Sequence, residues 1–99
     1  MRMLYVPEIA RELADARDWY ESRSDGLGEE FIRMAYAAFD ELQEYPEKYE
    51  VVYAPFRRAL LRRFPYSIYY HYAPDTITVY GVFHSSRDPQ RVLQMLGTR

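Results

Sequence analysis

The residues best suited to chemistry lie in the last half of the sequence, where a histidine follows a run of arginines. His84 is followed by Ser85, Ser86 and Arg87, and Arg63 stands earlier in the same basic region. A histidine titrates near neutral pH, so His84 is a candidate general acid or base. Arginines beside it would stabilise the charge on a phosphate during RNA cleavage. A strand-end histidine that only hydrogen-bonds its own turn has the same signature, so both interpretations stay open.

Two arginine pairs form a second group of candidate residues. Arg57-Arg58 and Arg62-Arg63 stand in a segment of β-type residues, and neighbouring residues of a strand point to opposite faces. Arg58 and Arg62 would share one face, while Arg57 and Arg63 would share the other and lie partly buried. A guanidinium binds carboxylate or phosphate through a planar fork. The pairs predict either a cationic patch for an acidic peptide or phosphate, or ion pairs with acids of the protein's own helices.

Other kinds of reactive site are missing from the sequence. It has no cysteine and two histidines, so we expect no thiolate or zinc site. It also has no glycine-rich phosphate loop and no nucleophile elbow, and we expect neither a metal nor another cofactor. No stretch approaches the roughly 18 apolar residues of a membrane span, and the start is too quickly charged for a signal peptide. These observations favour a cytoplasmic protein without membrane contact.

The charge is small overall but unevenly distributed along the chain. The 99 residues carry 13 basic and 15 acidic side chains, a net charge of −2, and the pI is about 5.7, which does not fit a general nucleic-acid binder. Lys48 is the one lysine, and most acids precede Tyr53. We expect a single domain over residues 1–99, with an acidic helical half and a basic sheet half.

Hydrophobic periodicity predicts two helices in the first half of the chain. After a short strand at Met3–Val6, Pro7 suits the first turn of a helix that runs from Glu8 to about Arg23. Its apolar stripe consists of Ile9, Leu13, Ala16 and Tyr20. A second stripe, which ends before Pro46, consists of Leu27, Phe31, Ala35, Ala38, Leu42 and Tyr45, flanked by Met34 and Phe39.

The link between these helices is short. It contains Ser24 and Asp25, and either residue is a typical N-cap for the second helix. Helices joined by about four residues form an antiparallel hairpin. The small residues in both stripes would let the two helices approach closely.

The second half of the chain predicts a sheet. Three runs rich in β-branched and aromatic residues cover Ala59–Phe64, Ser67–Tyr72 and Ile77–His84. Connections this short join antiparallel neighbours, so the three runs form a meander. A short strand at Val51–Tyr53 precedes them. The apolar residues within Val92–Leu96 predict one packed helical turn or a frayed tail.

These elements together predict an α+β fold in which an N-terminal helical hairpin packs on one face of a small antiparallel sheet. The order is a short strand, two helices and then the β meander. The other face of the sheet would stay more open. Alternating arginine and tyrosine side chains on that face would then meet a partner.

Four segments resemble the RelE/ParE family of bacterial type II toxin–antitoxin toxins. They read ELADARDWYESRSDGLGEEF, EYPEKYE, RRALLRRFPYSIYYHY and ITVYGVFHSSRDPQR, and the resemblance extends from Pro7 to Arg91. Their combination is specific, whereas no single segment is. The resemblance implies a compact α+β toxin of the plasmid-stabilisation type that inhibits growth. It also implies a hetero-oligomer with a cognate antitoxin that keeps the toxin inactive.

The resemblance further implies how the antitoxin binds. Antitoxins of this family pair with a sheet edge of the toxin and lay apolar side chains against its helices. The four arginines of the two pairs would suit an acidic antitoxin segment or the toxin's target. These residues are Arg57, Arg58, Arg62 and Arg63.

The family contains two kinds of activity. RelE-like members cleave mRNA on the ribosome, and His84, Arg63 and Arg87 fall in the regions that those nucleases use. ParE-like members poison DNA gyrase without nuclease activity. This sequence lacks a lysine-rich sheet, its tail has no terminal Tyr or His, and an acidic pI does not suit ribosome binding. We therefore favour a ParE-like, gyrase-directed toxin; a ribosome-dependent endoribonuclease and a relic that only binds its antitoxin remain alternatives.

Overall fold

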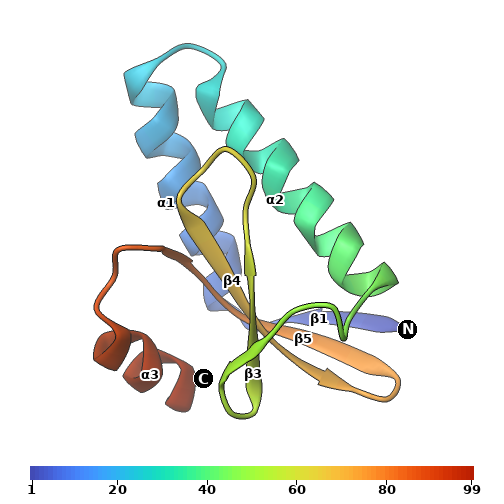
Figure 1. Cartoon of the computed structure of the whole chain (residues 1–99). Helices are drawn as coiled ribbons and strands as arrows, with labels where there is room; N and C mark the ends of the chain where they lie inside the picture. Colours follow the sequence, from blue (N-terminus) through green and yellow to red (C-terminus); the bar gives the residue numbers. More distant parts are fainter.

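A computed structural model describes residues 1–99, and its elements follow the order strand, two helices, four strands and a final helix (Figure 1). They are β1 (Arg2–Tyr5), α1 (Glu8–Arg23), α2 (Leu27–Glu44), β2 (Val51–Tyr53), β3 (Phe56–Leu60), β4 (Tyr66–Ala73), β5 (Thr76–His84) and α3 (Pro89–Gly97). This order confirms the α+β fold class and the helical hairpin followed by a meander.

The five strands form one sheet in the order β1-β5-β4-β3-β2. Strands β2 to β5 are antiparallel neighbours, as expected from their short connections. β1 adds to the edge at β5 and runs parallel to it, so the sheet is mixed. The hairpin of α1 and α2 carries the chain from one edge of the sheet to the other. The strands before and after it, β1 and β2, therefore lie at opposite edges.

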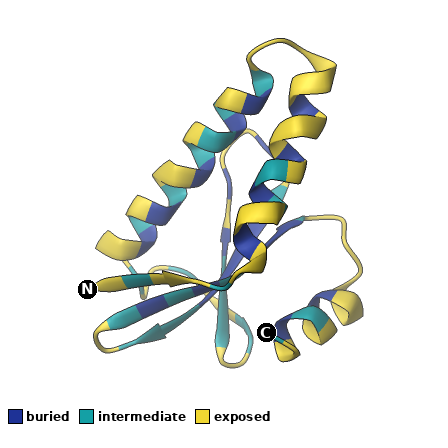
Figure 2. Ribbon diagram, turned by 180° about the vertical axis from the view of Figure 1, so that it is seen from behind, coloured by how far each residue is buried: buried dark blue, intermediate teal, exposed yellow.

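Both long helices cover the same face of the sheet, and their buried residues form stripes that point toward it (Figure 2). The buried residues of α1 are the four that periodicity predicts. The stripe of α2 agrees less closely: Phe31, Ala35 and Leu42 are buried as predicted, but Leu27 and Ala38 are only partly buried. Phe39 is buried, with 5% of its surface exposed, whereas Tyr45 is 52% exposed because the helix has already ended at Glu44.

The turn between α1 and α2 is capped in an unexpected way. Neither Ser24 nor Asp25 caps α2, whose N-cap is Gly26 at φ 86°, a conformation that glycine adopts without a steric penalty. The carboxylate of Glu21 instead accepts the N–H groups of Gly26 at 2.8 Å and Gly28 at 2.9 Å. These backbone hydrogen bonds lower the pKa of Glu21 below its ordinary value. A Cβ at Gly28 would lie 2.5 Å from a carbonyl oxygen of α1, so glycine is needed where the helices meet.

The expected strand at Ala59–Phe64 is wrong beyond its second residue. β3 ends at Leu60, and Arg63 has a positive φ of 69°, which is incompatible with a strand. Phe64 therefore turns back into the core beside Phe31. The β-type residue composition predicted a strand here, but the chain uses these residues for a turn that fills the core.

The second face of the sheet is not open along its length. α3 packs on it and buries Val92 and Leu96 against Tyr69 and Phe83. The side chain of Asp88 caps α3 by accepting the N–H of Gln90 at 3.4 Å. The predicted tail is thus a nine-residue helix. None of the helices has the length and apolar character required to cross a membrane.

Candidate functional site

The two arginine pairs do not form one patch. Arg57 lies on the helix-covered face and donates to the carbonyl of Tyr49 at 2.6 Å, so it binds the loop after α2. Arg58 alternates with it and points to the second face, while its backbone N–H bonds the carbonyl of Glu50. The first pair is split between faces, as its spacing predicts.

The second pair lies in the turn after β3. Arg63 was expected to be partly buried, but its side chain is 66% exposed and forms an ion pair with Glu30 in the first turn of α2. Arg62 is exposed and forms no ion pair, although it lies close enough to lower the pKa of Glu41. The sequence allowed either a cationic patch or ion pairs with acids of the helices. Arg63 forms such an ion pair, whereas the Arg62 side chain has no ion-pair partner.

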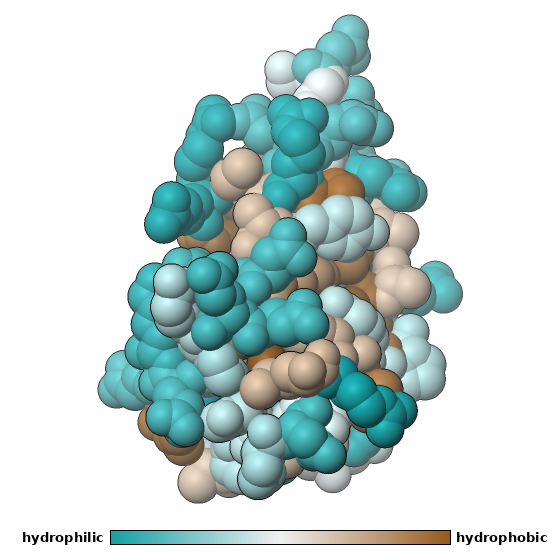
Figure 3. Space-filling view, turned by 90° about the vertical axis from the view of Figure 1, so that its right-hand side faces the viewer, coloured by the Kyte–Doolittle hydropathy of each residue, from teal (hydrophilic) through white to brown (hydrophobic).

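Arg62 and Arg63 line a groove beside α2, which we call the α2 groove. Its volume is about 730 Å³. Apolar residues of α2 and the exposed Leu60 form its floor, and carboxylates of α2, including Glu41 and Glu44, face the arginines. The α2 side of the molecule accordingly shows hydrophobic surface between hydrophilic side chains (Figure 3). This groove carries both charges and does not present a purely cationic surface.

His84 lies at the end of β5 and is bound to the turn that follows it. Its Nδ1 accepts the N–H of Ser86 at 3.1 Å and lies 2.7 Å from the Ser86 hydroxyl. With Nδ1 as acceptor, the neutral ring carries its proton on Nε2. The ring contacts Tyr66 edge-on, with centroids 5.3 Å apart. Burial raises the pKa of Tyr66 and the Arg87 charge opposes that rise.

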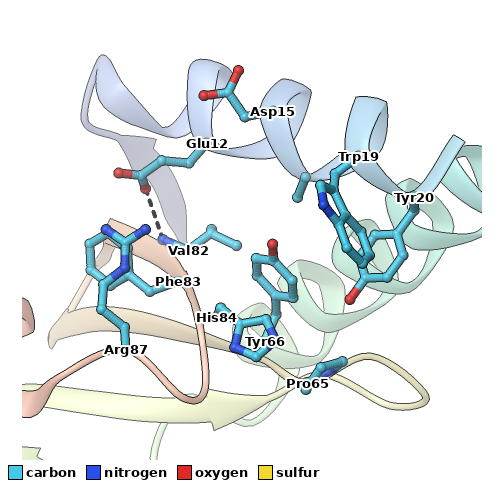
Figure 4. Close-up of a pocket in the computed structure, with 11 residues that line it drawn as sticks. Glu12, Asp15, Trp19, Tyr20, Pro65, Tyr66, Val82, Phe83, His84 and Arg87 are labelled. Carbon is cyan, nitrogen blue, oxygen red and sulfur yellow. Dashed lines mark hydrogen bonds between the residues drawn. The ribbon is translucent and has the colours of Figure 1, made fainter. Parts of the chain in front are cut away.

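A second groove brings His84 and Arg87 together with α1 (Figure 4). We call it the α1 groove; its volume is about 590 Å³. One wall is α1, from Glu12 to Tyr20, with the exposed Trp19 at the rim. The floor and the other wall are Pro65, Tyr66, Val82, Phe83, His84 and Arg87. The groove is therefore aromatic, with carboxylates on the helix and a guanidinium opposite.

Side chains that the sequence analysis did not single out close one end of the α1 groove. Glu12 accepts the backbone N–H of Val82 at 3.0 Å and pairs with Arg99, whose side chain is only 7% exposed. Arg99 also donates to the carbonyl of Tyr80 at 2.9 Å and lies over the Phe83 ring. Glu12 lies 70 residues from Val82 in the chain and still further from Arg99, so no local spacing signals these contacts.

The candidate nuclease residues do not converge. Arg63 lines the α2 groove, whereas His84 and Arg87 line the α1 groove. Arg87 lies over the Phe83 ring at 5.3 Å and donates to the sulfur of Met95 at 3.4 Å. No three His, Asp or Glu side chains are grouped so as to hold a metal ion.

A third groove lies between β1 and the helical hairpin and is almost entirely apolar. Its volume is about 470 Å³. It is lined by Tyr5, Val6, Pro7, Ile9, Ala10, Leu13, Tyr36 and Phe39. Tyr5 and Tyr36 are 47% and 56% exposed. We call this the hairpin groove, and it lies beside the unpaired outer edge of β1.

Charge is divided between the two layers, as expected. Helices α1 and α2 contain ten acidic side chains and four arginines, so their net charge is −6. The rest of the chain has nine basic and five acidic side chains, a net charge of +4. A partner would therefore meet opposite potentials on the two sides of the molecule.

Comparison with known proteins gives consistent results. Residues 4–89 match the family described as the ParE toxin of the type II toxin–antitoxin system parDE. No curated protein matches the sequence significantly. A solved structure described as the chromosomal ParDE TA system from P. aeruginosa is similar in fold, with a TM-score of 0.63 and 14% sequence identity. The match covers 85% of this chain and 95% of that one. The family match spans most of the sequence, and the chain belongs to the ParE toxin family of type II toxin–antitoxin systems.

Proposed function

We propose that this toxin arrests growth by binding DNA gyrase, without cleaving RNA, and that a cognate antitoxin neutralises it in the cytoplasm. The observation that carries the proposal is the separation of the candidate nuclease residues. Arg63 is bound to Glu30 at the start of α2, while His84 and Arg87 lie in the α1 groove. General acid–base cleavage requires these groups within hydrogen-bonding reach of one phosphate.

The electrostatics of the α1 groove support the same choice. Glu12 and Asp15 form part of its wall, and they belong to a helical layer with a net charge of −6. Phosphate contacts dominate the affinity of proteins for RNA. An acidic wall beside His84 opposes such contacts, whereas it does not oppose a protein target.

For the antitoxin, we propose a docking surface that combines the hairpin groove with the outer edge of β1. β1 is the edge strand, so one side of its backbone is free to pair with an added strand. The adjacent groove accepts apolar side chains. Among the four candidate arginines, Arg63 pairs with Glu30 and the Arg57 side chain donates to the carbonyl of Tyr49. Arg58 and Arg62 are the ones left available to an acidic partner segment.

The test of this function starts from induced expression of the toxin. Growth arrest with intact mRNA, together with loss of gyrase supercoiling by the purified protein, is the expected outcome. New mRNA ends within translated codons would overturn the proposal in favour of the ribosome-dependent endoribonuclease. In that case His84→Ala would relieve toxicity in a folded protein, whereas we expect it to stay toxic.

A second control separates toxicity from antitoxin binding. Co-expression with the cognate antitoxin should restore growth and give a stable complex. A protein that binds the antitoxin but never arrests growth would be a relic that has lost its target, and our proposal of a gyrase poison would be wrong.

A further inference from the structure

The outer edge of β5 is only half covered by a strand. β1 pairs with β5 from Thr76 to Val79, and the last contact is the N–H of Val6 with the carbonyl of Val79. Beyond this point the chain leaves the sheet to begin α1. The register between β4 and β5 then skips Tyr80, which makes a bulge. The rest of the β5 edge has no strand beside it.

Two side chains take the place of that missing strand at the bulge. Glu12 accepts the N–H of Val82, and Arg99 donates to the carbonyl of Tyr80. The two side chains also pair with each other. A carboxylate and a guanidinium therefore satisfy backbone groups that a neighbouring strand would otherwise bind.

The next two outward groups have no such partner. Because the N–H of Val82 points to Glu12, its carbonyl also points away from β4. His84 pairs with Tyr66, whose carbonyl accepts the N–H of Leu61 on the far side of β4, so the N–H of His84 points outward as well. We call the Val82 carbonyl and the His84 N–H the β5 edge site. Both residues line the α1 groove (Figure 4).

The geometry of the β5 edge site selects the direction of an added strand. An antiparallel partner would need both the N–H and the carbonyl of one residue. At Val82 the N–H is bound to Glu12, and at His84 the carbonyl accepts the N–H of Arg87. A parallel partner residue opposite Phe83 needs only the Val82 carbonyl and the His84 N–H, which are the two free groups. An added segment would thus run in the direction of β1.

The side chains around the site specify the segment. A residue opposite Phe83 would point to the same side as Phe83, where the Arg87 guanidinium lies 5.3 Å from the ring centroid. The Arg99 guanidinium lies 5.1 Å from the same centroid but is already paired with Glu12, so Arg87 is the available cation. An acidic side chain fits there. Its two neighbours would point to the opposite side, toward the aromatic wall that includes Trp19 and Tyr66, where apolar side chains fit.

We propose that the β5 edge site binds an extended segment of the cognate antitoxin, with the pattern apolar–acidic–apolar, added parallel to β5 opposite Phe83. This inference rests on the proposed neutralisation by an antitoxin. It gives the α1 groove a role in partner binding that is separate from the hairpin groove. Arg87 and Trp19 both line this groove.

Amide hydrogen exchange measured by NMR tests the site directly, on the toxin alone and in complex with its cognate antitoxin. In the free toxin the His84 amide should exchange quickly, and in the complex it should slow by about tenfold or more. The Val82 amide is the internal control, because Glu12 already binds it in the free toxin. Trp19, the one tryptophan of the chain, should also show a blue-shifted emission.

A charge reversal tests the acidic residue. Arg87→Glu should weaken antitoxin binding by about tenfold, the change expected from roughly 1.4 kcal/mol, and an antitoxin variant with the facing acid changed to arginine should restore it. Arg91→Glu is the matched control, because Arg91 is exposed on the next helix and does not line the groove. A stable complex with an unprotected His84 amide would overturn the edge site alone. Failure to form any complex would overturn the proposed neutralisation and the edge site together.

Discussion

The two faces of the sheet are built very differently. Under the helical hairpin, 16 buried residues form a continuous core that draws on both long helices and three strands. Under α3 the core has four buried residues, and a single ion pair between Glu12 and Arg99 ties the end of the chain to α1. The first face has enough apolar burial to fold cooperatively. The second face depends on a few contacts, each of which matters more to its local order.

This difference also bears on where the proposed partner surface lies. The α1 groove lies at the boundary between the two cores, where α1 passes over the end of β5 and the tail of the chain reaches back. Backbone groups at a boundary have no neighbouring strand, so side chains or a partner must satisfy them. The well-packed face supplies rigidity, and its edge supplies unsatisfied groups for recognition.

The largest effect should come from the helix-covered core. Phe31 is fully buried and contacts the rings of Tyr20, Phe64 and Tyr66. Phe31→Ala should lower the free energy of unfolding by about 3–5 kcal/mol, which is a large part of the roughly 5–15 kcal/mol that stabilises a typical domain. Urea denaturation followed by circular dichroism measures this. Tyr36→Ala in the same helix removes an exposed ring and should change stability by less than about 1 kcal/mol; equal losses in the two variants would contradict the comparison.

A substitution in the small core under α3 should affect mainly the local order of α3. Leu96 is 1% exposed under α3, so Leu96→Ala should cost about 2–3 kcal/mol. Because the small core lies apart from the large one, amides of α3 should exchange faster while those of α2 keep their protection. Leu93→Ala is the matched control, since Leu93 lies in the same helix but is 45% exposed. Equal acceleration in α2 and α3 would mean that the two faces form one cooperative unit.

The ion pair that joins the two faces should have an intermediate effect. Arg99→Gln removes the charge that pairs with Glu12 and the donor to the Tyr80 carbonyl. We expect a loss of about 1–3 kcal/mol, the range for a buried group left without its partner. A double-mutant cycle with Glu12→Gln measures the coupling between the two residues. A coupling energy near zero would show that the pair does not connect α3 to α1.

Periodicity predicted the first face because its helices have regular apolar spacing. The four buried residues of α1 and the limits of β4 and β5 agree with the sequence to within a residue. The failure occurs where the chain departs from regular backbone. The predicted strand at Ala59–Phe64 ends early, at Leu60, and is followed by a turn in which Arg63 has a positive φ.

The candidate site was less predictable, and for a physical reason. His84 and Arg87 were singled out by residue type, because a histidine can act as a general acid or base and an arginine can bind phosphate. The contacts of Glu12 and Arg99 join segments distant in the sequence, and neither residue stands out in a list of charges. Strand alternation predicted that Arg57 would lie partly buried, which it does, but it could not foresee that Arg63 would leave the strand and bind Glu30.

The smallest effect concerns the turn of the helical hairpin, and it depends on pH. Two backbone N–H groups, from Gly26 and Gly28, donate to the carboxylate of Glu21 and lower its pKa below the ordinary value of 4.5. A carboxyl whose pKa is lowered by folding stabilises the protein above its unfolded pKa. That contribution is lost as the pH falls through the folded pKa, so acid should loosen this turn.

Thermal unfolding across a pH series tests this contribution. The midpoint temperature of unfolding of the wild type should fall as the pH drops below about 4.5. That of Glu21→Gln should fall less steeply, because the amide does not titrate. Glu29→Gln removes the same charge from the first turn of α2, and its midpoint temperature should fall with pH as steeply as that of the wild type. Some acid sensitivity should remain in Glu21→Gln, because hydrogen bonds from Lys48 and Tyr49 also lower the pKa of Glu41. Parallel pH profiles for Glu21→Gln and wild type would show that the cap is too exposed to stabilise the hairpin, and only the buried stripes of α1 and α2 would then hold it together.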